Sequence, residues 1–369
     1  MNRRGFGVAV VVLLVTVVLF GYRQHQRDAE QRTLIPPKLL PSSPPPLEQM
    51  AEPPLQQPVG QSVSQSFKQL RQVSAFRRKD VVVSGGWGSG PGQFGHKRVL
   101  DALPEGPLAL SVASDGSVLI LDQVNRRLLR FRDGRAVSSI PLGQDSAQDL
   151  ALGPEGRLVV LDRLLERGVQ IYSAEGELLH EVSLAGKLEL GGLTGVFVDE
   201  HGIYLERDHG LVQRSADLDG QRSDSERDLV GRPSRDGQLA ISAALLDPQS
   251  GQLTVRAHDR VKGQSLWQRV IQLPQPILQL VMIDSDRAGR IYLAAVTAIE
   301  EQTPPYRLSE EALYVMQLGR DGNERSRLKL PPLHGSDESY RPVTVDDGGN
   351  LYVLSTTENG VTVTRYVFP

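Results

Sequence analysis

The chain has 369 residues, enough for two ordinary domains or for one large repeat domain with additional segments. Charged residues make up 23% of it and the formal net charge is −3, so no strong overall field favours binding to nucleic acid or to an anionic membrane. The chain contains no cysteine, which excludes disulfides, thiolate metal sites, thiol catalysis and a lipidated N-terminal cysteine.

An uncharged apolar run occupies residues 5–22, with Arg3 and Arg4 before it. As a helix this run reaches about 27 Å, close to the roughly 30 Å of a bilayer core. A cleaved signal peptide is the alternative, but the run exceeds a usual signal core and no small-x-small cleavage pattern follows Phe20. Residues 1–27 are therefore predicted to be a single-pass signal anchor. The arginine pair favours an inside N-terminus and an extracytoplasmic remainder, periplasmic or extracellular.

Two segments connect this anchor to the rest of the chain. Residues 28–60 are rich in proline and glutamine and cannot build a core, which predicts an extended, disordered linker. In residues 61–79 apolar side chains recur at intervals of four and three, which predicts a short amphipathic lead-in helix with basic residues off the apolar stripe.

The remainder, residues 80–369, repeats one pattern of apolar runs and turn glycines. Six such glycines recur at intervals of roughly 40–60 residues: Gly116, Gly156, Gly202, Gly251, Gly289 and Gly349. Each lies between two short apolar runs, as in a hairpin that joins two strands. Four strands in about 40 residues are typical of a propeller blade, so the sequence predicts an all-β, six-bladed β-propeller.

The two ends of this region predict how the ring closes. The last repeat ends one strand short, while the segment 80–84 (DVVVS) precedes the first repeat without a partner. Pairing 80–84 as the outer strand of blade six would leave no open edge between the first and last blades.

Blade one carries the most specific motifs. Residues 88–94 (GSGPGQF), 112–116 (VASDG) and 121–131 (LDQVNRRLLRF) resemble the NHL repeat, which implies a six-bladed propeller of the NHL or TolB type over residues 80–369. The middle blades depart from that pattern, because Glu206 stands where the repeat has its loop Asp. Some propellers of this kind are lyases with histidines around the channel, and gluconolactonase-like relatives hold a divalent cation.

Loop length distinguishes the two faces of the predicted propeller. Tight Asp-Gly turns share one face, and the long loops 85–106, 231–237, 300–311 and 331–340 are assigned to the other, where binding usually resides. Aromatic residues beside arginine favour a protein interface there. The predicted binding residues are Trp87, Phe94, His96, Arg98, Tyr306, His334, Tyr340 and Arg341. The alternative for Trp87 and Phe94 is that they pack the Gly-rich loop onto blade one.

Signals for catalysis are weak. None of the seven histidines forms a His-x-x-x-His pair, so a metal site would need ligands from several blades, with His96, His209 and His334 as weak candidates. Four aspartates, Asp199, Asp247, Asp284 and Asp346, are placed at the ends of first strands, where we expect them to cap hairpins. No catalytic residue and no cofactor is predicted, with a divalent metal as the alternative.

These observations predict a membrane-tethered, extracytoplasmic propeller that acts as a non-catalytic binding or scaffolding module. The expected partners are a protein or polymer on the long-loop face and the membrane through residues 5–22, without nucleic acid. One alternative is a metal-dependent propeller hydrolase or lyase. Another is an accessory or sensor subunit of an envelope complex.

Overall fold

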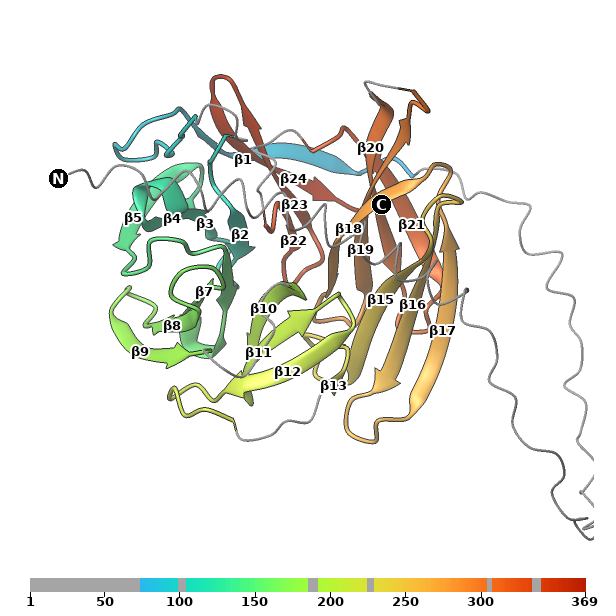
Figure 1. Cartoon of the computed structure of the whole chain (residues 1–369), viewed down its shortest axis with the longest axis horizontal. Coiled ribbons are helices and arrows are strands. Elements are labelled where there is room, and N and C mark those ends of the chain that lie inside the picture. The colour runs from blue at the N-terminus through green and yellow to red at the C-terminus, as the bar shows by residue number, and fades with distance from the viewer. Residues whose placement is uncertain (1–73, 99–103, 185–191, 224–228, 304–306, 334–339) are drawn as a thin grey trace, which may run out of the picture. The chain divides into compact units, whose positions relative to one another are not determined.

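The computed structural model describes residues 74–98, 104–184, 192–223, 229–303, 307–333 and 340–369. The chain divides into two compact units, 1–63 and 64–369, and all described residues belong to the second. They form six antiparallel sheets of four strands each, arranged in a ring (Figure 1). The all-β, six-bladed propeller that the repeats predicted is confirmed.

Five of the blades are continuous in sequence. Blade one contains β2 (Ala109–Val112), β3 (Val118–Asp122), β4 (Arg127–Arg132) and β5 (Arg135–Pro141), and blade two contains β6 (Asp149–Leu152), β7 (Leu158–Asp162), β8 (Gly168–Tyr172) and β9 (Leu178–Ser183). Blade three contains β10 (Leu193–Asp199), β11 (Gly202–Arg207), β12 (Leu211–Ala216) and β13 (Leu229–Val230). Short 3-10 turns, η3 (Gln123–Asn125) and η4 (Pro154–Gly156), interrupt the first two blades.

Blades four and five have longer strands. Blade four contains β14 (Arg232–Pro233), β15 (Leu239–Asp247), β16 (Gln252–Asp259) and β17 (Ser265–Gln272). Blade five contains β18 (Ile277–Ser285), β19 (Ile291–Glu300), β20 (Leu308–Leu318) and β21 (Glu324–Leu330). In the five blades that are continuous in sequence, the strand order in the sheet follows the order along the chain, so consecutive strands pair antiparallel.

Blade six combines the two ends of the described chain. It contains β22 (Val343–Val345), β23 (Leu351–Thr357) and β24 (Gly360–Val367), and its outer strand is β1 (Arg78–Gly85). Arg78 pairs with Val367 and Gly85 with Val361, so β1 runs antiparallel along nearly all of β24. The pairing covers an edge that would otherwise be open, and it joins the start of the ring to its end.

The helix predicted over residues 61–79 is absent from residues 74–79, the part of that range that the structure describes. Residues 74–77 belong to no regular element, and Arg78 already begins β1. The backbone N–H of Arg77 donates to the carbonyl of Val367, and the Phe76 ring packs edge-on against Tyr366 at 5.4 Å. The free edge of β24 therefore supplies backbone partners that a helix at this position would forgo.

Blade four is divided differently from the sequence interpretation. Its inner strand is the two-residue β14, and the tight turn that follows contains Gly237, whose N–H donates to the carbonyl of Ser234. Gly251, assigned to that face from the sequence, instead joins the second and third strands at the opposite end. Consequently Asp247 does not end a first strand, and residues 234–238 are a tight turn rather than a long-loop insertion.

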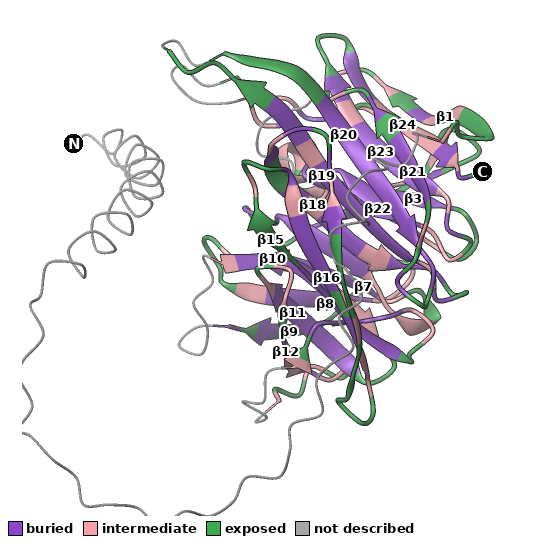
Figure 2. Cartoon of the chain, turned by 90° about the vertical axis from the view of Figure 1, so that its right-hand side faces the viewer, coloured by how far each residue is buried: buried purple, intermediate pink, exposed green. Residues whose placement is uncertain are grey.

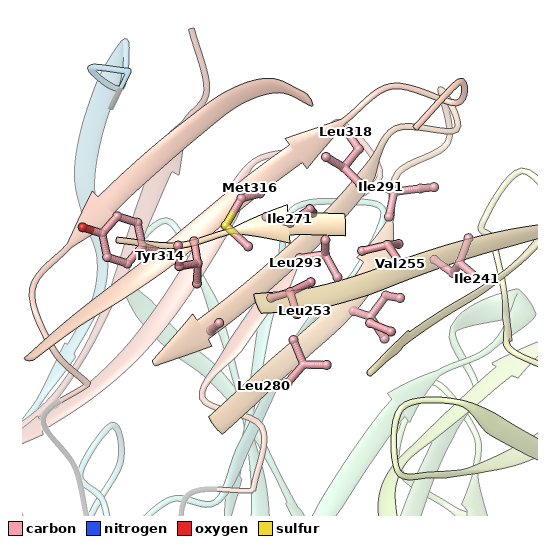
Figure 3. Close-up of a cluster of buried hydrophobic side chains, with 14 of the residues drawn as sticks. Ile241, Leu253, Val255, Ile271, Leu280, Ile291, Leu293, Tyr314, Met316 and Leu318 are labelled. Atoms are coloured by element: carbon pink, nitrogen blue, oxygen red, sulfur yellow. The ribbon is translucent and has the colours of Figure 1, made fainter. Parts of the chain in front are cut away.

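The core lies between neighbouring blades. Alternate residues along each strand face the next sheet, as Leu253 and Val255 of β16 do toward Leu293 of β19 and Met316 of β20 (Figure 3). All four side chains are completely or almost completely buried. Each such aliphatic side chain contributes up to about 1.5–3 kcal/mol of hydrophobic free energy.

Strand direction defines two faces of the ring. The tight-turn face carries the turns between first and second strands, and the start of β1 and the end of β24 lie on it. The long-loop face carries the turns between second and third strands. Figure 2 shows the C-terminus on one side of the ring and the exposed ends of β15 and β20 on the other.

The predicted membrane anchor cannot be compared with this fold. Residues 5–22, the linker 28–60 and residues 61–73 all lie outside the described residues. Within the parts that the structure describes, no helix combines the length and apolar character needed to span a bilayer.

Candidate functional site

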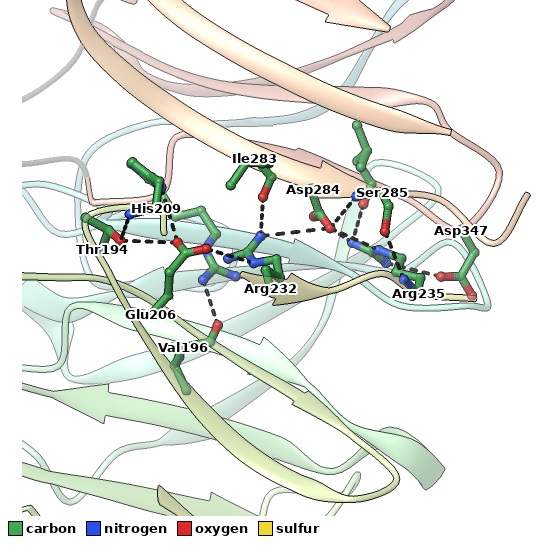
Figure 4. A network of polar contacts seen from close by, with 12 residues as sticks. Thr194, Val196, Glu206, His209, Arg232, Arg235, Ile283, Asp284, Ser285 and Asp347 are labelled. Carbon is green, nitrogen blue, oxygen red and sulfur yellow. Dashed lines mark hydrogen bonds and ion pairs between the residues drawn. The ribbon is translucent and has the colours of Figure 1, made fainter. Parts of the chain in front are cut away.

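Charged side chains from several blades converge at the centre of the ring (Figure 4). The cavity there is lined by residues of blades three to six, including Thr194, Glu206, His209, Arg232 and Tyr340. Its internal volume is about 10 Å³, which is about the space that one water molecule needs. Side chains of the described residues thus leave little free space in this cavity.

Arg341 links blade six to the opposite side of the ring. Its guanidinium lies 2.6 Å from Asp149 Oδ2 of β6 and donates to the carbonyls of Val196 (2.7 Å) and Leu150 (3.2 Å). Asp149 is completely buried, and its Oδ2 also accepts from the Val196 N–H at 2.8 Å. One arginine therefore joins blades six, two and three and neutralises a buried carboxylate.

A second group surrounds Glu206 at the end of β11. Its Oε2 accepts from the Thr194 hydroxyl at 3.2 Å and lies 3.2 Å from His209 Nδ1, while Oε1 lies 3.4 Å from Arg232 Nε. Arg232 also donates from Nη1 to the carbonyl of Ile283 at 2.5 Å. Burial raises the pKa of Glu206, but the Arg232 and His209 side chains outweigh burial and hold that pKa below its usual value.

His209 connects blade three to blade five. Its Nε2 lies 3.0 Å from the carbonyl oxygen of Leu280 in β18. Because a carbonyl oxygen only accepts, Nε2 is the donor in this contact, while Nδ1 faces the Glu206 carboxylate, so both ring nitrogens are already engaged. The His209 carbonyl in turn accepts from the Ala243 N–H of β15 at 3.0 Å, so this turn touches blades four and five together.

The third group lies toward the tight-turn face. Arg235 donates to Asp284 Oδ2 at 3.0 Å, to Asp347 Oδ1 at 3.1 Å and to the Val345 carbonyl at 2.7 Å. Burial raises the pKa of Asp284, but Arg235 and then Arg232 outweigh burial and hold the pKa below its usual value. The group links blade four to blades five and six.

The arrangement does not fit a channel-bound divalent cation. Each of the central carboxylates, Asp149, Glu206 and Asp284, already faces a guanidinium within 3.4 Å. A cation there would have to displace an arginine from a buried acid, which is costly. Across the described ranges, no three His, Cys, Asp or Glu side chains are grouped so that they could hold a metal ion.

The three candidate metal histidines do not form a described site. His209 lies in the channel, whereas His96 stacks on Trp87 with ring centroids 4.3 Å apart, in the Gly-rich loop of blade one. His334 lies outside the described residues, as does the predicted binding residue Tyr306.

Three other predicted binding residues, Trp87, Phe94 and Arg98, lie in or next to the Gly-rich loop of blade one and differ in exposure. Phe94 is fully buried and stacks on Phe131 at 5.7 Å, so it packs the Gly-rich loop instead of contacting a partner. Trp87 is half-buried and donates from Nε1 to the carbonyls of Thr357 and Glu358. Arg98 is exposed beside an undescribed segment.

Tyr340 and Arg341 lie in the channel, where neither was expected. The Tyr340 hydroxyl donates to the Leu193 carbonyl at 2.5 Å, and the Arg163 guanidinium lies 4.8 Å from the Tyr340 ring centre. Both predicted residues therefore serve contacts between blades.

The repeat motif of blade one has a structural role. Asp122 is fully buried, accepts from the Gly95 N–H at 2.8 Å and pairs with Arg127 at 2.8 Å. Arg127 also donates to the carbonyls of Ser89 and Gln93, which ties the Gly-rich loop down to the blade.

Most of the channel residues lack a signal in the sequence. Asp149, Arg232 and Arg235 had no motif around them, and Glu206 was noted only as a departure from the repeat. Arg232 and Pro233 form a two-residue inner strand without an apolar run, so no local signal marks that position as part of the channel.

Exposed aliphatic side chains gather at the long-loop ends of blades four and five. This set, here called the apolar rim, comprises Leu245, Leu246, Leu278, Ile299 and Leu308, each 40–55% exposed. Two backbone bonds hold their segments together: the Ile277 N–H donates to the Pro248 carbonyl, and the Ala298 N–H to the Pro276 carbonyl.

Comparisons with known proteins do not identify an activity for this chain. No family model matches the sequence, and the search of curated proteins found no match. Solved structures with similar folds include hydrazine synthase of Kuenenia stuttgartiensis (TM-score 0.45, 14% identity, 67% of this chain and 73% of that one). Others are virginiamycin B lyase from Staphylococcus aureus (0.41, 10%, 74% and 98%) and a gluconolactonase from Xanthomonas campestris (0.39, 16%, 71% and 86%). Similarities this low assign neither a substrate nor a reaction to the chain.

Proposed function

We propose that this protein is a non-catalytic binding or scaffolding module that engages a protein partner through its long-loop face. The observation that carries the proposal is the apolar rim. Five aliphatic side chains are exposed at the same end of two adjacent blades. Single exposed aliphatics are ordinary on a protein surface, but several that gather at one end of a rigid scaffold favour an interface.

The channel chemistry supports the same proposal. The Asp149, Glu206 and Asp284 carboxylates are all engaged by arginines, and the cavity beside Glu206 and Asp284 holds about one water. A general acid or base has to reach a substrate atom within hydrogen-bonding distance, and this cavity has no room for a substrate beside Glu206 and Asp284. The channel is better suited to holding blades together than to catalysis.

The predicted anchor in residues 5–22 and the predicted linker in 28–60 precede β1 in the chain. They would tether the binding module to a membrane, with the propeller on the extracytoplasmic side.

The test is site-specific photo-crosslinking in cells with the full chain. A benzophenone amino acid replaces Leu246 on the long-loop face or, as the control, Val261, which is 91% exposed in a turn on the tight-turn face. The proposal predicts discrete adducts with another protein from position 246 and none from position 261. No adduct from 246, or the same adducts from both positions, would contradict it.

A further inference from the structure

One hairpin of the ring extends beyond its own sheet. The last residue of β19 that pairs with β18 is Thr297. On the other side of the hairpin, the first residue of β20 that pairs with β21 is Leu313. Residues 298–300 and 308–312 therefore form a two-stranded ribbon at the long-loop face, with Glu300 paired to Leu308. β21 ends at Leu330, where Pro331 and Pro332 follow and cannot donate to a ladder.

Within the described residues, this geometry leaves the β20 side of the ribbon without a partner strand. Among the strands that the structure describes, none pairs with β20 residues 308–312 on the side away from β19. The backbone groups along such an edge are a template for a further strand from another chain.

The base of the ribbon is held firmly in place. Glu310 has a positive φ of 52° and, with Glu311, forms a bulge between the pairs Thr297–Ala312 and Ile299–Ser309. Gln275, which is 9% exposed, donates to Glu310 Oε2 at 2.8 Å and accepts from the Thr297 hydroxyl at 3.0 Å. A preorganised edge loses little conformational entropy when a partner strand binds.

The charges around the edge indicate which partner fits. Glu300, Glu310 and Glu311 are all exposed, and none forms an ion pair within the described residues. Like charges directly opposite one another destabilise strand pairs, so a second copy of this acidic edge is disfavoured. Opposite charges stabilise them, so basic side chains are favoured.

We propose that the free edge of β20, residues 308–312, docks an extended protein segment that carries lysine or arginine beside apolar side chains. The basic groups face the ribbon glutamates, and the apolar groups contact Leu308 and the rest of the apolar rim. This inference rests on the proposed function of the long-loop face and specifies its partner.

The experiment uses the full chain in neutral-lipid nanodiscs and two labelled ten-residue peptides, one alternating Val and Lys and one alternating Val and Glu. The Val-Lys peptide is expected to bind and to slow amide hydrogen exchange in residues 308–312, and its affinity should fall as salt is raised. The double variant Glu300→Lys/Glu311→Lys should weaken its binding at least tenfold. Glu175→Lys/Glu177→Lys, which changes two exposed glutamates of blade two, should leave binding unchanged.

Three outcomes would overturn the inference: equal binding of both peptides, no effect of the Glu300/Glu311 variant, or binding without protection of residues 308–312. Adducts from Leu246 with this chain's own residues 61–73, or with a second copy, would also overturn it. If Leu246 gives adducts with another protein while the Val-Lys peptide fails, the proposed function stands and only the basic partner is wrong.

Discussion

At the scale of single residues, the channel shows how a buried charge becomes a structural requirement. Asp149 has no exposed surface, and Arg341 is the cation that contacts it directly. An acid in that position must be paired, because water cannot reach it. The residue that pairs with it comes from the other end of the sequence, 192 positions away.

We expect Arg341→Ala to destabilise the fold strongly. The change leaves Asp149 as an uncompensated buried charge and removes donors from two carbonyls, which should cost about 3–5 kcal/mol of unfolding free energy. Urea denaturation measures the effect. The control Arg98→Ala, at an exposed position, should stay within about 0.5 kcal/mol of wild type. An unchanged midpoint for Arg341→Ala would show that the ion pair is dispensable.

Asp284 should make stability depend on acid pH. Its folded-state pKa lies below the unfolded value of about 3.9, so its contribution is complete above that pH and is lost as the pH falls through the folded pKa. The unfolding free energy of wild type should therefore decrease more steeply below about pH 4 than that of Asp284→Asn. Denaturation curves between pH 3 and 7 provide the comparison, and parallel slopes would rule this contribution out.

At the scale of elements, strand length decides what a sequence pattern reveals. Strands with clear apolar runs, such as β3 and β7, are predicted from the sequence because each contains four consecutive apolar residues. β14 has two residues, an arginine and a proline, and no pattern could identify it as an inner strand. Consequently, the second and third strands of blade four were interpreted from the sequence as its first and second strands.

The closing strand provides a test at this scale. A chain that begins at Trp87 lacks β1 and exposes the edge of β24, whereas a chain that begins at Ser74 keeps it. Loss of the buried Val83 and of the edge pairing should lower the melting temperature by more than about 5 °C and promote association. Calorimetry and light scattering report both effects. Equal melting temperatures for the two chains would mean that ring closure adds no stability.

At the scale of the whole molecule, the predicted anchor makes a claim that fractionation can check. If residues 5–22 span a bilayer, the full chain should stay in the membrane fraction after washing with high salt and with alkaline carbonate. A chain without residues 1–27 should be released in soluble form. Extraction of the full chain by carbonate would disprove a transmembrane anchor.

The sequence by itself determined the architecture: six repeats of strands and turn glycines, with an unpaired segment at each end of the ring. It could do so because alternating apolar residues and positive-φ glycines are local requirements that each blade meets separately. The sequence predicted Phe94 as a binding residue, and the alternative that it packs the Gly-rich loop onto blade one is the one that fits its complete burial.

Only the tertiary structure decided what the charged residues do. Asp149, Glu206, Arg232 and Arg341 come from four blades, and no local pattern relates them. Tyr340 and Arg341 seemed suited to a binding surface, yet the ring places them in its centre. The physical reason is that a buried charge is stabilised by whichever partner the fold brings near it, so its role is set by long-range packing and cannot be read from its neighbours in the chain.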